Sequence, residues 1–335
     1  MKGRYAQTEH PSPLWFGTGV HFSMEDFHGW RHFPTASAAF DAFVDATSEH
    51  SKHGGPSLPT DLAELIDLGH GMLDYYEEWL KTRPKFDTLV LNGKPQVEVH
   101  VIVPIDLDLL PPWVREHWDE VLYAATFDRV CIDEYERLWI VEYKTAKRME
   151  WFHLGTDPQV TAYCWLGSQV YDLPIAGVIY QQHRKQVPEG PRILADGRVS
   201  QQTAGTTYAK YRQTMTKIYG TESSRWPGNN ITALNSLLKE EDDTKDLFIQ
   251  RDRTTRSEHQ IEAEGQKILL ELEDILNPNL PLYPNPNRMF CSWCAFQHAC
   301  IDMDDGGDWQ ADLGYEFKPQ TQERDSWRKH LKLPL

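Results

Sequence analysis

The stretch FDRVCIDEYERLWIVEYKTAKR, residues 127–148, decides how the chain folds. Two apolar, β-branched runs, at about 122–132 and 138–144, read as neighbouring strands joined by the polar turn 133–136. The first strand carries Asp128, and the second carries Glu142 and Lys144. Because side chains alternate between the faces of a strand, Glu142 and Lys144 share one face and Tyr143 points to the other.

This arrangement of charges has a chemical use. Two carboxylates on neighbouring strands can hold a hard divalent cation through oxygen ligands. The ion lowers the pKa of a bound water, and a lysine beside it can stabilise the anionic transition state of phosphodiester cleavage. An acid-x-Lys pattern is also common in salt bridges on a solvated face. The apolar run 138–141 places the charges at the edge of a core, which favours Asp128, Glu142 and Lys144 as catalytic residues.

Residues downstream of the strands extend the predicted site. Asp157-Pro158 has the signals of a helix start, and the helix runs to about residue 169. Gln159 and Tyr163 share one face of it and are candidate DNA contacts, although helix-surface and packing residues give the same pattern. Lys147 and Arg148 are candidate phosphate contacts, with a solvated charge run as the alternative. His183-Arg184-Lys185 is a weaker candidate of the same kind.

Upstream, Gly17-Thr-Gly-Val-His21 predicts a glycine-flanked turn that places His21 at the start of a helix. A lone histidine of this kind is more often structural than a ligand. Helices are expected at about 35–50 and 60–82, followed by strands 88–91 and 96–104 around the hairpin signal Asn92-Gly93. Further on, the patterns predict a strand at 177–183, a hairpin around 196–197, and helices at 206–219 and 257–276.

The order of elements predicts an α/β fold with a mixed β-sheet core flanked by helices. We expect one domain, 1–335, with four parts: an N-terminal helical part (14–83), a sheet-rich catalytic core (88–200), a helical part (204–276) and a Cys-rich C-terminal segment (277–335) that wraps the body as loops.

Composition narrows the class of protein. A formal charge of −16 over 335 residues argues against non-specific coating of nucleic acid, but a metal site needs only clustered carboxylates and a DNA track only a local basic strip. No apolar run approaches the roughly 20 residues that cross a bilayer. Residues 1–13 are polar and lack the apolar stretch of a signal peptide. These features predict a cytoplasmic protein without a membrane partner.

Taken in order, the motifs resemble the PD-(D/E)XK nuclease superfamily, in its RecB-like exonuclease branch. Gly17–His21 matches the Gly-x-x-x-His element that supplies a metal-binding histidine, and Glu142-Tyr143-Lys144 matches the (D/E)xK tripeptide. Asp128 matches the acidic residue of the first core strand, although Phe127 stands where the family has proline. Gln159 to Tyr163 matches the following Gln-x-x-x-Tyr. The resemblance implies a restriction-endonuclease-like core, Mg²⁺ or Mn²⁺ held by His21, Asp128 and Glu142, and cleavage of DNA.

Three cysteines near the C-terminus, Cys291, Cys294 and Cys300, form a Cx2Cx5C pattern that predicts a metal or cluster site. The iron–sulfur members of the same branch, which include the CRISPR-adaptation exonucleases, carry this spacing and hold a [4Fe–4S] cluster with a fourth cysteine before the histidine element. No cysteine precedes His21 here. The open alternatives for the fourth ligand are Cys131, Cys164, His10, His298 or a residue upstream of Met1, and a Cys₃His zinc site is the alternative to a cluster.

These expectations combine into a metal-dependent DNA exonuclease acting on single strands or DNA ends, in recombination, repair or phage DNA metabolism. If the protein is phage-encoded, it acts in the host cytoplasm. A recombination or helicase protein is the expected partner besides DNA. The alternatives are a structure-specific endonuclease and a non-catalytic DNA-binding subunit that retains the nuclease fold.

Overall fold

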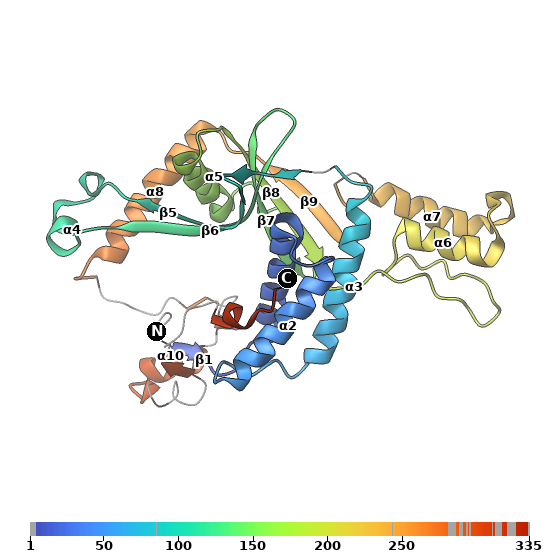
Figure 1. Ribbon diagram of the computed structural model, residues 1–335, viewed down its shortest axis with the longest axis horizontal. Helices are drawn as coiled ribbons and strands as arrows, with labels where there is room; N and C mark the ends of the chain where they lie inside the picture. The colour runs from blue at the N-terminus through green and yellow to red at the C-terminus, as the bar shows by residue number, and fades with distance from the viewer. Residues whose placement is uncertain are drawn as a thin grey trace.

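A computed structural model describes residues 5–84, 86–242, 244–280, 286–287, 291–292, 294, 296–309, 311, 317–319 and 326–333. A mixed sheet lies at its centre (Figure 1). Its strands are β2 (Asp87–Thr88), β5 (Val97–Pro104), β6 (Leu122–Ile132), β7 (Leu138–Ala146), β8 (Ile175–Arg184) and β9 (Ile249–Thr254). They pair in the order β2-β6-β7-β8-β9, with β5 also paired to β6.

The directions of the strands follow from their connections. A short turn joins β6 to β7, and the two strands are antiparallel. Helix α5 (Pro158–Val170) joins β7 to β8, and these strands are parallel, as a strand–helix–strand crossover requires. β9 pairs antiparallel with β8. This mixed sheet flanked by helices confirms the predicted fold class and is consistent with a restriction-endonuclease-like fold.

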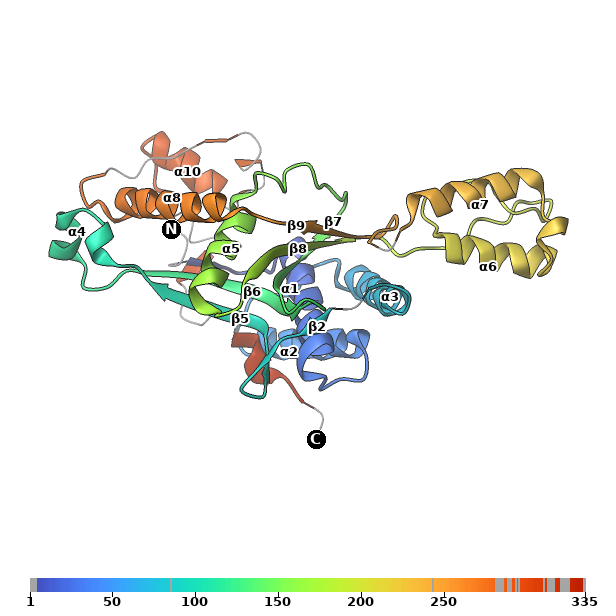
Figure 2. The same ribbon diagram turned by 90° about the horizontal axis from the view of Figure 1, so that it is seen from above.

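Helices of the N-terminal part cover one face of the sheet, as Figure 2 shows. They are α1 (Ser12–Glu25), η1 (Asp26–Trp30), α2 (Ala36–Lys52) and α3 (Leu62–Leu80). Their aromatic side chains pack against Trp139, Val141 and Tyr143 of β7. The intervening residues of β7, Leu138 and Ile140, pack on the opposite face, so the alternation read from the sequence is confirmed.

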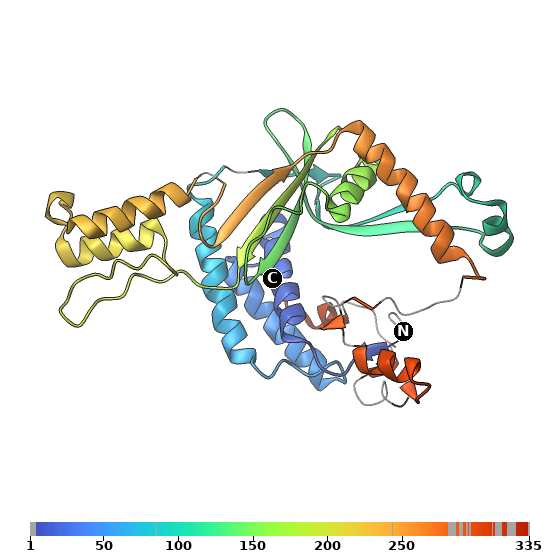
Figure 3. The same ribbon diagram turned by 180° about the vertical axis from the view of Figure 1, so that it is seen from behind.

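The opposite face is covered by α5 and α8 (Glu258–Leu276), seen from behind in Figure 3. Asp157 caps α5 by accepting hydrogen bonds from the backbone of Gln159 and Val160. Ser257 and Gln260 form the expected capping box at the start of α8. Both helix starts therefore lie where the sequence placed them.

Helix α1 corrects the expectation for the His21 segment. It begins at Ser12, so Gly17 and Gly19 lie inside it and His21 lies near its C-terminal end. A Cβ on Gly19 would lie 2.6 Å from the ring of Phe40. Gly19 therefore does not form a turn. Its lack of a side chain lets α2 approach α1 closely.

An arm, residues 185–248, is inserted between β8 and β9 and projects away from the sheet (Figures 1 and 3). It contains α6 (Tyr208–Tyr219), η3 (Ser223–Arg225) and α7 (Gly228–Glu240). These helices have a core of their own, which includes Tyr211, Met215 and Leu234. The sequence predicts mainly helices beyond residue 204, and β9, which follows the arm, corrects that prediction.

The remaining elements connect or close the molecule. Strands β3 (Val90–Leu91) and β4 (Lys94–Pro95) form the predicted hairpin, with positive φ at Asn92 and Gly93. Three further elements are η2 (Leu107–Leu109), α4 (Pro112–His117) and α10 (Gln297–Asp304). β1 (Tyr5–Gln7) pairs with β10 (Phe317–Pro319), and η4 (Ser326–His330) packs on α2. The sequence predicts that the C-terminal segment consists of loops. The helices α10 and η4 correct that prediction. No helix of the described chain is both long and apolar enough to span a membrane.

Candidate metal centre

Asp128 and Glu142 lie across from each other on β6 and β7. The register pairs Arg129 with Val141, and Asp128 and Glu142 are the next residues along. Asp128 Oδ2 accepts a hydrogen bond of 2.7 Å from the backbone N–H of Tyr143, which fixes this carboxylate on the strand. Both acidic residues are buried, and the Tyr143 side chain lies on the other face. The two strands thus bring together the pair of carboxylates that their sequence predicted.

His21 approaches the same carboxylates from α1. Its Nδ1 lies 3.2 Å from Asp128 Oδ1 and 3.9 Å from Glu98 Oε1. Within the described ranges, His21, Glu98 and Asp128 form the one group of at least three His, Cys, Asp or Glu residues whose ligand atoms lie within 4.8 Å of one another. The predicted histidine therefore does face the predicted carboxylate.

Glu98 is a site residue that no motif in the sequence indicates. It lies on β5 between Val97, paired with Arg129, and Val99, paired with Phe127, and therefore beside Asp128. Its φ of 45° is in the left-handed region, where a residue with a side chain is strained. In a strand of alternating residues, a glutamate is expected to face solvent. The role of Glu98 follows only from the pairing of β5 with β6, which the sequence does not predict.

Lys144, Gln159 and Tyr163 form a chain of hydrogen bonds beside Glu142. Lys144 Nζ donates to Glu142 Oε1 and, over 3.3 Å, to Gln159 Oε1. Gln159 Nε2 donates to Tyr163 Oη at 2.9 Å, and that hydroxyl donates to the backbone oxygen of Thr126 at 3.0 Å. Tyr163 is buried. Its hydroxyl holds Gln159 in place, and a contact of Tyr163 with DNA stays a prediction.

The crowded carboxylates perturb one another. Burial and the neighbouring Asp128 raise the pKa of Glu142 to about 7. Burial and Asp128 raise the pKa of Glu98 to about 7 as well. Burial opposes the charged form of His21, but Asp128 outweighs it and raises the pKa of His21 to about 9. Protons on these groups offset the negative charge, and a bound cation would replace some of them.

The residues present fit a divalent metal ion. Glu142 Oε2 is a buried oxygen without a hydrogen-bond partner, and leaving such an atom unsatisfied costs free energy that a cation would recover. The donor set consists of carboxylate oxygens and one imidazole nitrogen. Oxygen donors suit Mg²⁺ and Mn²⁺, and the nitrogen shifts preference somewhat toward Mn²⁺.

Charged residues of both signs lie near the site. Arg328 of η4 forms a bidentate ion pair with Glu25, at 3.2 and 2.7 Å, although the two residues are 303 apart in sequence. Lys147 and Arg148 are exposed on the loop after β7, where a phosphate could reach them. His183 is instead buried, with Gln181 Nε2 at 2.8 Å from its Nε2, so the basic surface expected at 183–185 excludes it.

The cysteines do not converge in the part of the chain that is described. Among the described residues, Cys291, Cys294 and Cys300 belong to no group of three or more gathered ligand atoms, so a cluster or zinc site on them stays a prediction. Cys131 and Cys164 are buried in the two core clusters on either face of the sheet. Much of the predicted Cys-rich segment, 277–335, lies outside the described residues.

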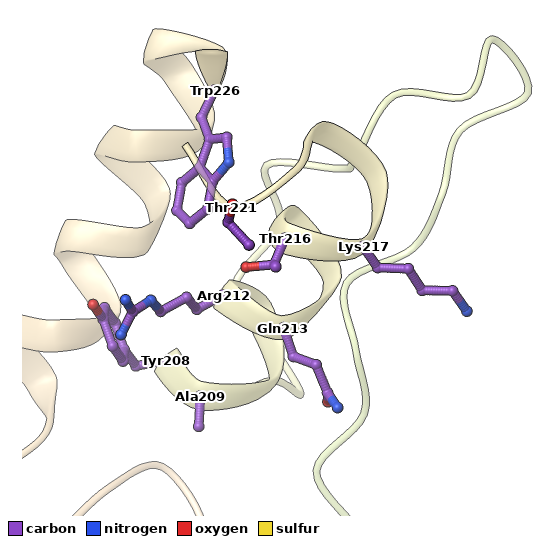
Figure 4. Close-up of a pocket in the computed structure, with 8 residues that line it drawn as sticks. All are labelled: Tyr208, Ala209, Arg212, Gln213, Thr216, Lys217, Thr221 and Trp226. Atoms are coloured by element: carbon purple, nitrogen blue, oxygen red, sulfur yellow. The ribbon is translucent and has the colours of Figure 1, made fainter. Parts of the chain in front are cut away.

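A hollow of about 770 Å³ lies on the arm (Figure 4), which projects away from the sheet (Figure 1). Its lining contains no carboxylate and no predicted site residue: Tyr208, Ala209, Arg212, Gln213, Thr216, Lys217, Thr221 and Trp226. The arm therefore does not supply a second metal centre at this hollow.

Comparison with known proteins supports the assignment drawn from the strands. No curated protein matches the chain. The model of one family, described as the PD-(D/E)XK nuclease superfamily, matches residues 2–301. This range includes β6 and β7 with their carboxylates, α1 with His21, and α5. Nucleases of this superfamily use Mg²⁺ or Mn²⁺, in keeping with the donor set around Asp128. The chain therefore belongs to the PD-(D/E)XK nuclease superfamily.

Proposed function

We propose that the protein is a metal-dependent deoxyribonuclease, an exonuclease that cleaves phosphodiester bonds of single-stranded DNA or DNA ends. The observation that carries the proposal is the meeting of His21, Glu98 and Asp128 beside the orphaned oxygen of Glu142. We further propose a role in recombination, repair or phage DNA metabolism, in the cytoplasm and with a recombination or helicase partner, for which the resemblance to RecB-like nucleases is the support.

Each residue has a role that follows from its contacts. Asp128, Glu142, His21 and Glu98 would hold the metal ion. The bound ion would lower the pKa of a water and offset charge on the phosphate. Lys144, kept beside Glu142 by Gln159, would orient that water or stabilise the pentacovalent phosphate. Lys147 and Arg148 would bind the DNA backbone near the scissile bond.

Cleavage of end-labelled linear and of circular single-stranded DNA, with and without Mn²⁺, tests this proposal. We expect metal-dependent cleavage of the linear strand only, and an endonuclease would also open the circle. Asp128→Ala and Glu142→Ala should abolish cleavage and leave the protein folded. Lys144→Ala should lose a factor of about 10²–10³ if it supplies one transition-state contact. Glu134→Ala, on the exposed turn between the same strands, is the matched control and should cleave normally. Full activity of Asp128→Ala would contradict the assignment.

For Cys291, Cys294 and Cys300 we propose a structural metal or [4Fe–4S] site, supported by the Cx2Cx5C spacing alone. Such a site would order a Pro- and Asn-rich segment, because ligand binding adds to folding free energy. Brown colour and iron in the purified protein would indicate a cluster, and zinc in a colourless protein would indicate the alternative. A purified protein with neither metal would contradict this role.

A further inference from the structure

Two aromatic side chains project into solvent from the loop between β7 and α5. Trp151 is 60% exposed and Phe152 is 80% exposed, the largest value for any large hydrophobic side chain that the structure describes. Large exposed apolar groups placed side by side are uncommon on a protein surface unless they bind something. Trp151 and Phe152 belong to none of the hydrophobic core clusters. Leu154, near the end of the loop, belongs to the cluster between the sheet and α5.

The loop is held on both sides of the aromatic pair. Before it, the backbone N–H and C=O of Glu150 both bond to the side-chain amide of Gln182, each at 2.9 Å. After it, Leu154 is buried and its backbone oxygen accepts a hydrogen bond of 2.6 Å from Arg256. Trp151 and Phe152 are therefore presented to solvent by a fixed backbone.

The same contacts fix the loop to the metal centre. Gln182, which holds Glu150, is the β8 partner of Lys144. The His153 ring contacts the Tyr180 ring at 5.8 Å, and Tyr180 is the β8 partner of Glu142. The Phe152 ring lies 5.9 Å from that of His153. The aromatic pair thus stands at the rim of the carboxylate site.

Cationic side chains lie near the pair. Lys147 and Arg148 are exposed in the same loop. On the other side, a hollow of about 470 Å³ beside Trp151 is lined in part by Arg256, together with one carboxylate, that of Asp252. Exposed aromatics among cations bind single-stranded nucleic acid, because bases stack on the rings while phosphates meet the charges. In a duplex both faces of each internal base are covered by its neighbours, so such rings favour unpaired bases.

We propose that Trp151 and Phe152 form a base-stacking platform for the unpaired nucleotides of a DNA strand that enters the carboxylate site. This inference rests on the proposed nuclease function and adds the residues that select unpaired bases. The platform binds bases and takes no part in bond cleavage, so its effect belongs to affinity and to substrate choice.

The test compares Trp151→Ala/Phe152→Ala with the parent protein by fluorescence anisotropy, in EDTA so that no cleavage occurs. The probes are a labelled oligothymidylate of about 12 nucleotides, an abasic strand of the same length, and a blunt duplex. We expect the double variant to lose at least about tenfold in affinity for the oligothymidylate, since removal of one stacked base costs on that scale. Affinity for the abasic strand and the duplex should stay the same.

Tyr135→Ala is the matched control, because Tyr135 is 69% exposed on the turn at the opposite end of β7. It should bind all three probes like the parent.

Unchanged binding of oligothymidylate by the double variant would overturn the platform and leave the pair as a contact for a protein partner. An equal loss on the abasic strand would also overturn it. If the parent protein cleaves DNA and Trp151→Ala/Phe152→Ala binds all three probes like the parent, only this inference fails. If the parent neither binds nor cleaves DNA, the proposed function fails with it.

Discussion

Glu98 keeps an unfavourable backbone conformation at the metal centre. A φ of 45° costs a glutamate about 1–3 kcal/mol, and the surrounding strand pairs on β5 and β6 hold it there. What the protein gains is a carboxylate within ligand distance of His21 and Asp128. The strained backbone at Glu98 contributes nothing to the stability of the sheet. It therefore supports a binding role for the Glu98 side chain.

Two substitutions separate the strain from the carboxylate. Glu98→Ala removes the carboxylate and keeps the strained backbone, whereas Glu98→Gly removes both, since glycine tolerates positive φ. Both variants should bind Mn²⁺ more weakly in calorimetry, to the same extent. In denaturant unfolding without metal, Glu98→Gly should be more stable than Glu98→Ala by about 1 kcal/mol. Equal stability of the two, or unchanged Mn²⁺ affinity, would contradict this reading of Glu98.

The raised carboxyl pKa values predict how metal binding depends on pH. Glu98 and Glu142, both with a pKa of about 7, hold protons in the metal-free protein below that pH. In the metal-free protein, these two groups favour the folded state at low pH, and that contribution is lost as pH rises through about 7. Mn²⁺ must displace the protons, so its affinity should rise between pH about 6 and about 8.

Thermal shift by Mn²⁺ across this range measures the effect. The shift should grow with pH in the parent protein. It should grow less in Glu98→Gln, in which one of the two titrating ligands is gone. A shift of constant size from pH about 6 to about 8 would show that these carboxylates do not bind the ion.

Among the secondary-structure elements, α1 shows why a glycine pattern does not by itself mark a turn. Gly17 and Gly19 looked like turn residues, but both lie inside a helix. Gly19 is required by packing, because an added Cβ would lie 2.6 Å from Phe40 and 2.7 Å from Phe43. The distinction depends on a helix that is distant in sequence, and no local pattern contains it.

The two glycines offer a matched pair of substitutions. Gly19→Ala should destabilise the protein by about 1–3 kcal/mol, because α1 or α2 must move to admit the methyl group. That movement should also displace His21 and weaken Mn²⁺ binding. Gly17→Ala meets only Thr145 Oγ1 at 3.9 Å and should be neutral or stabilising by up to about 1 kcal/mol. Chemical denaturation of both variants measures this difference, and equal stability would contradict it.

The sheet was predictable where its strands are apolar and was missed where a strand is polar. β6 and β7 carry alternating or continuous apolar residues, so they and the Asp128, Glu142 and Lys144 positions could be read directly. β9 reads IQRDRT, which is polar, yet Arg251 is buried against the rings of Trp79 and Phe86. Tertiary cation–π contacts stabilise that strand, and they cannot be seen in its own sequence.

At the scale of the whole molecule, the arm and the sheet are separate packing units. The arm leaves β8 and returns to β9, and the backbone N–H of Arg184 donates to Phe248 at its base over 2.8 Å. Val187 lies against Gly71 of α3, and Asp246 accepts a hydrogen bond from Tyr75 one turn further on. The two ends of the arm therefore stand close together on α3, as the ends of an insertion must.

We expect the arm to be removable. Replacing residues 188–245 by a short glycine-containing turn should leave the sheet, the N-terminal helices and the metal centre folded. Circular dichroism should show a melting temperature within a few degrees of the parent, and cleavage of a short single-stranded DNA should persist. Aggregation or a much lower melting temperature would show that the arm is part of the core fold.

The contact of η4 with the first helices sets the time at which the protein can finish folding. Trp327 packs edge-on against Phe22 and Phe43, and Arg328 pairs with Glu25. At bacterial-to-eukaryotic translation rates, residue 328 leaves the ribosome roughly 15–60 s after residue 25. For that interval the nascent N-terminal helices present an uncovered aromatic surface beside an unpaired glutamate. We therefore expect the helical layer of a growing chain to be a binding surface for chaperones until η4 has been synthesised and has packed on it.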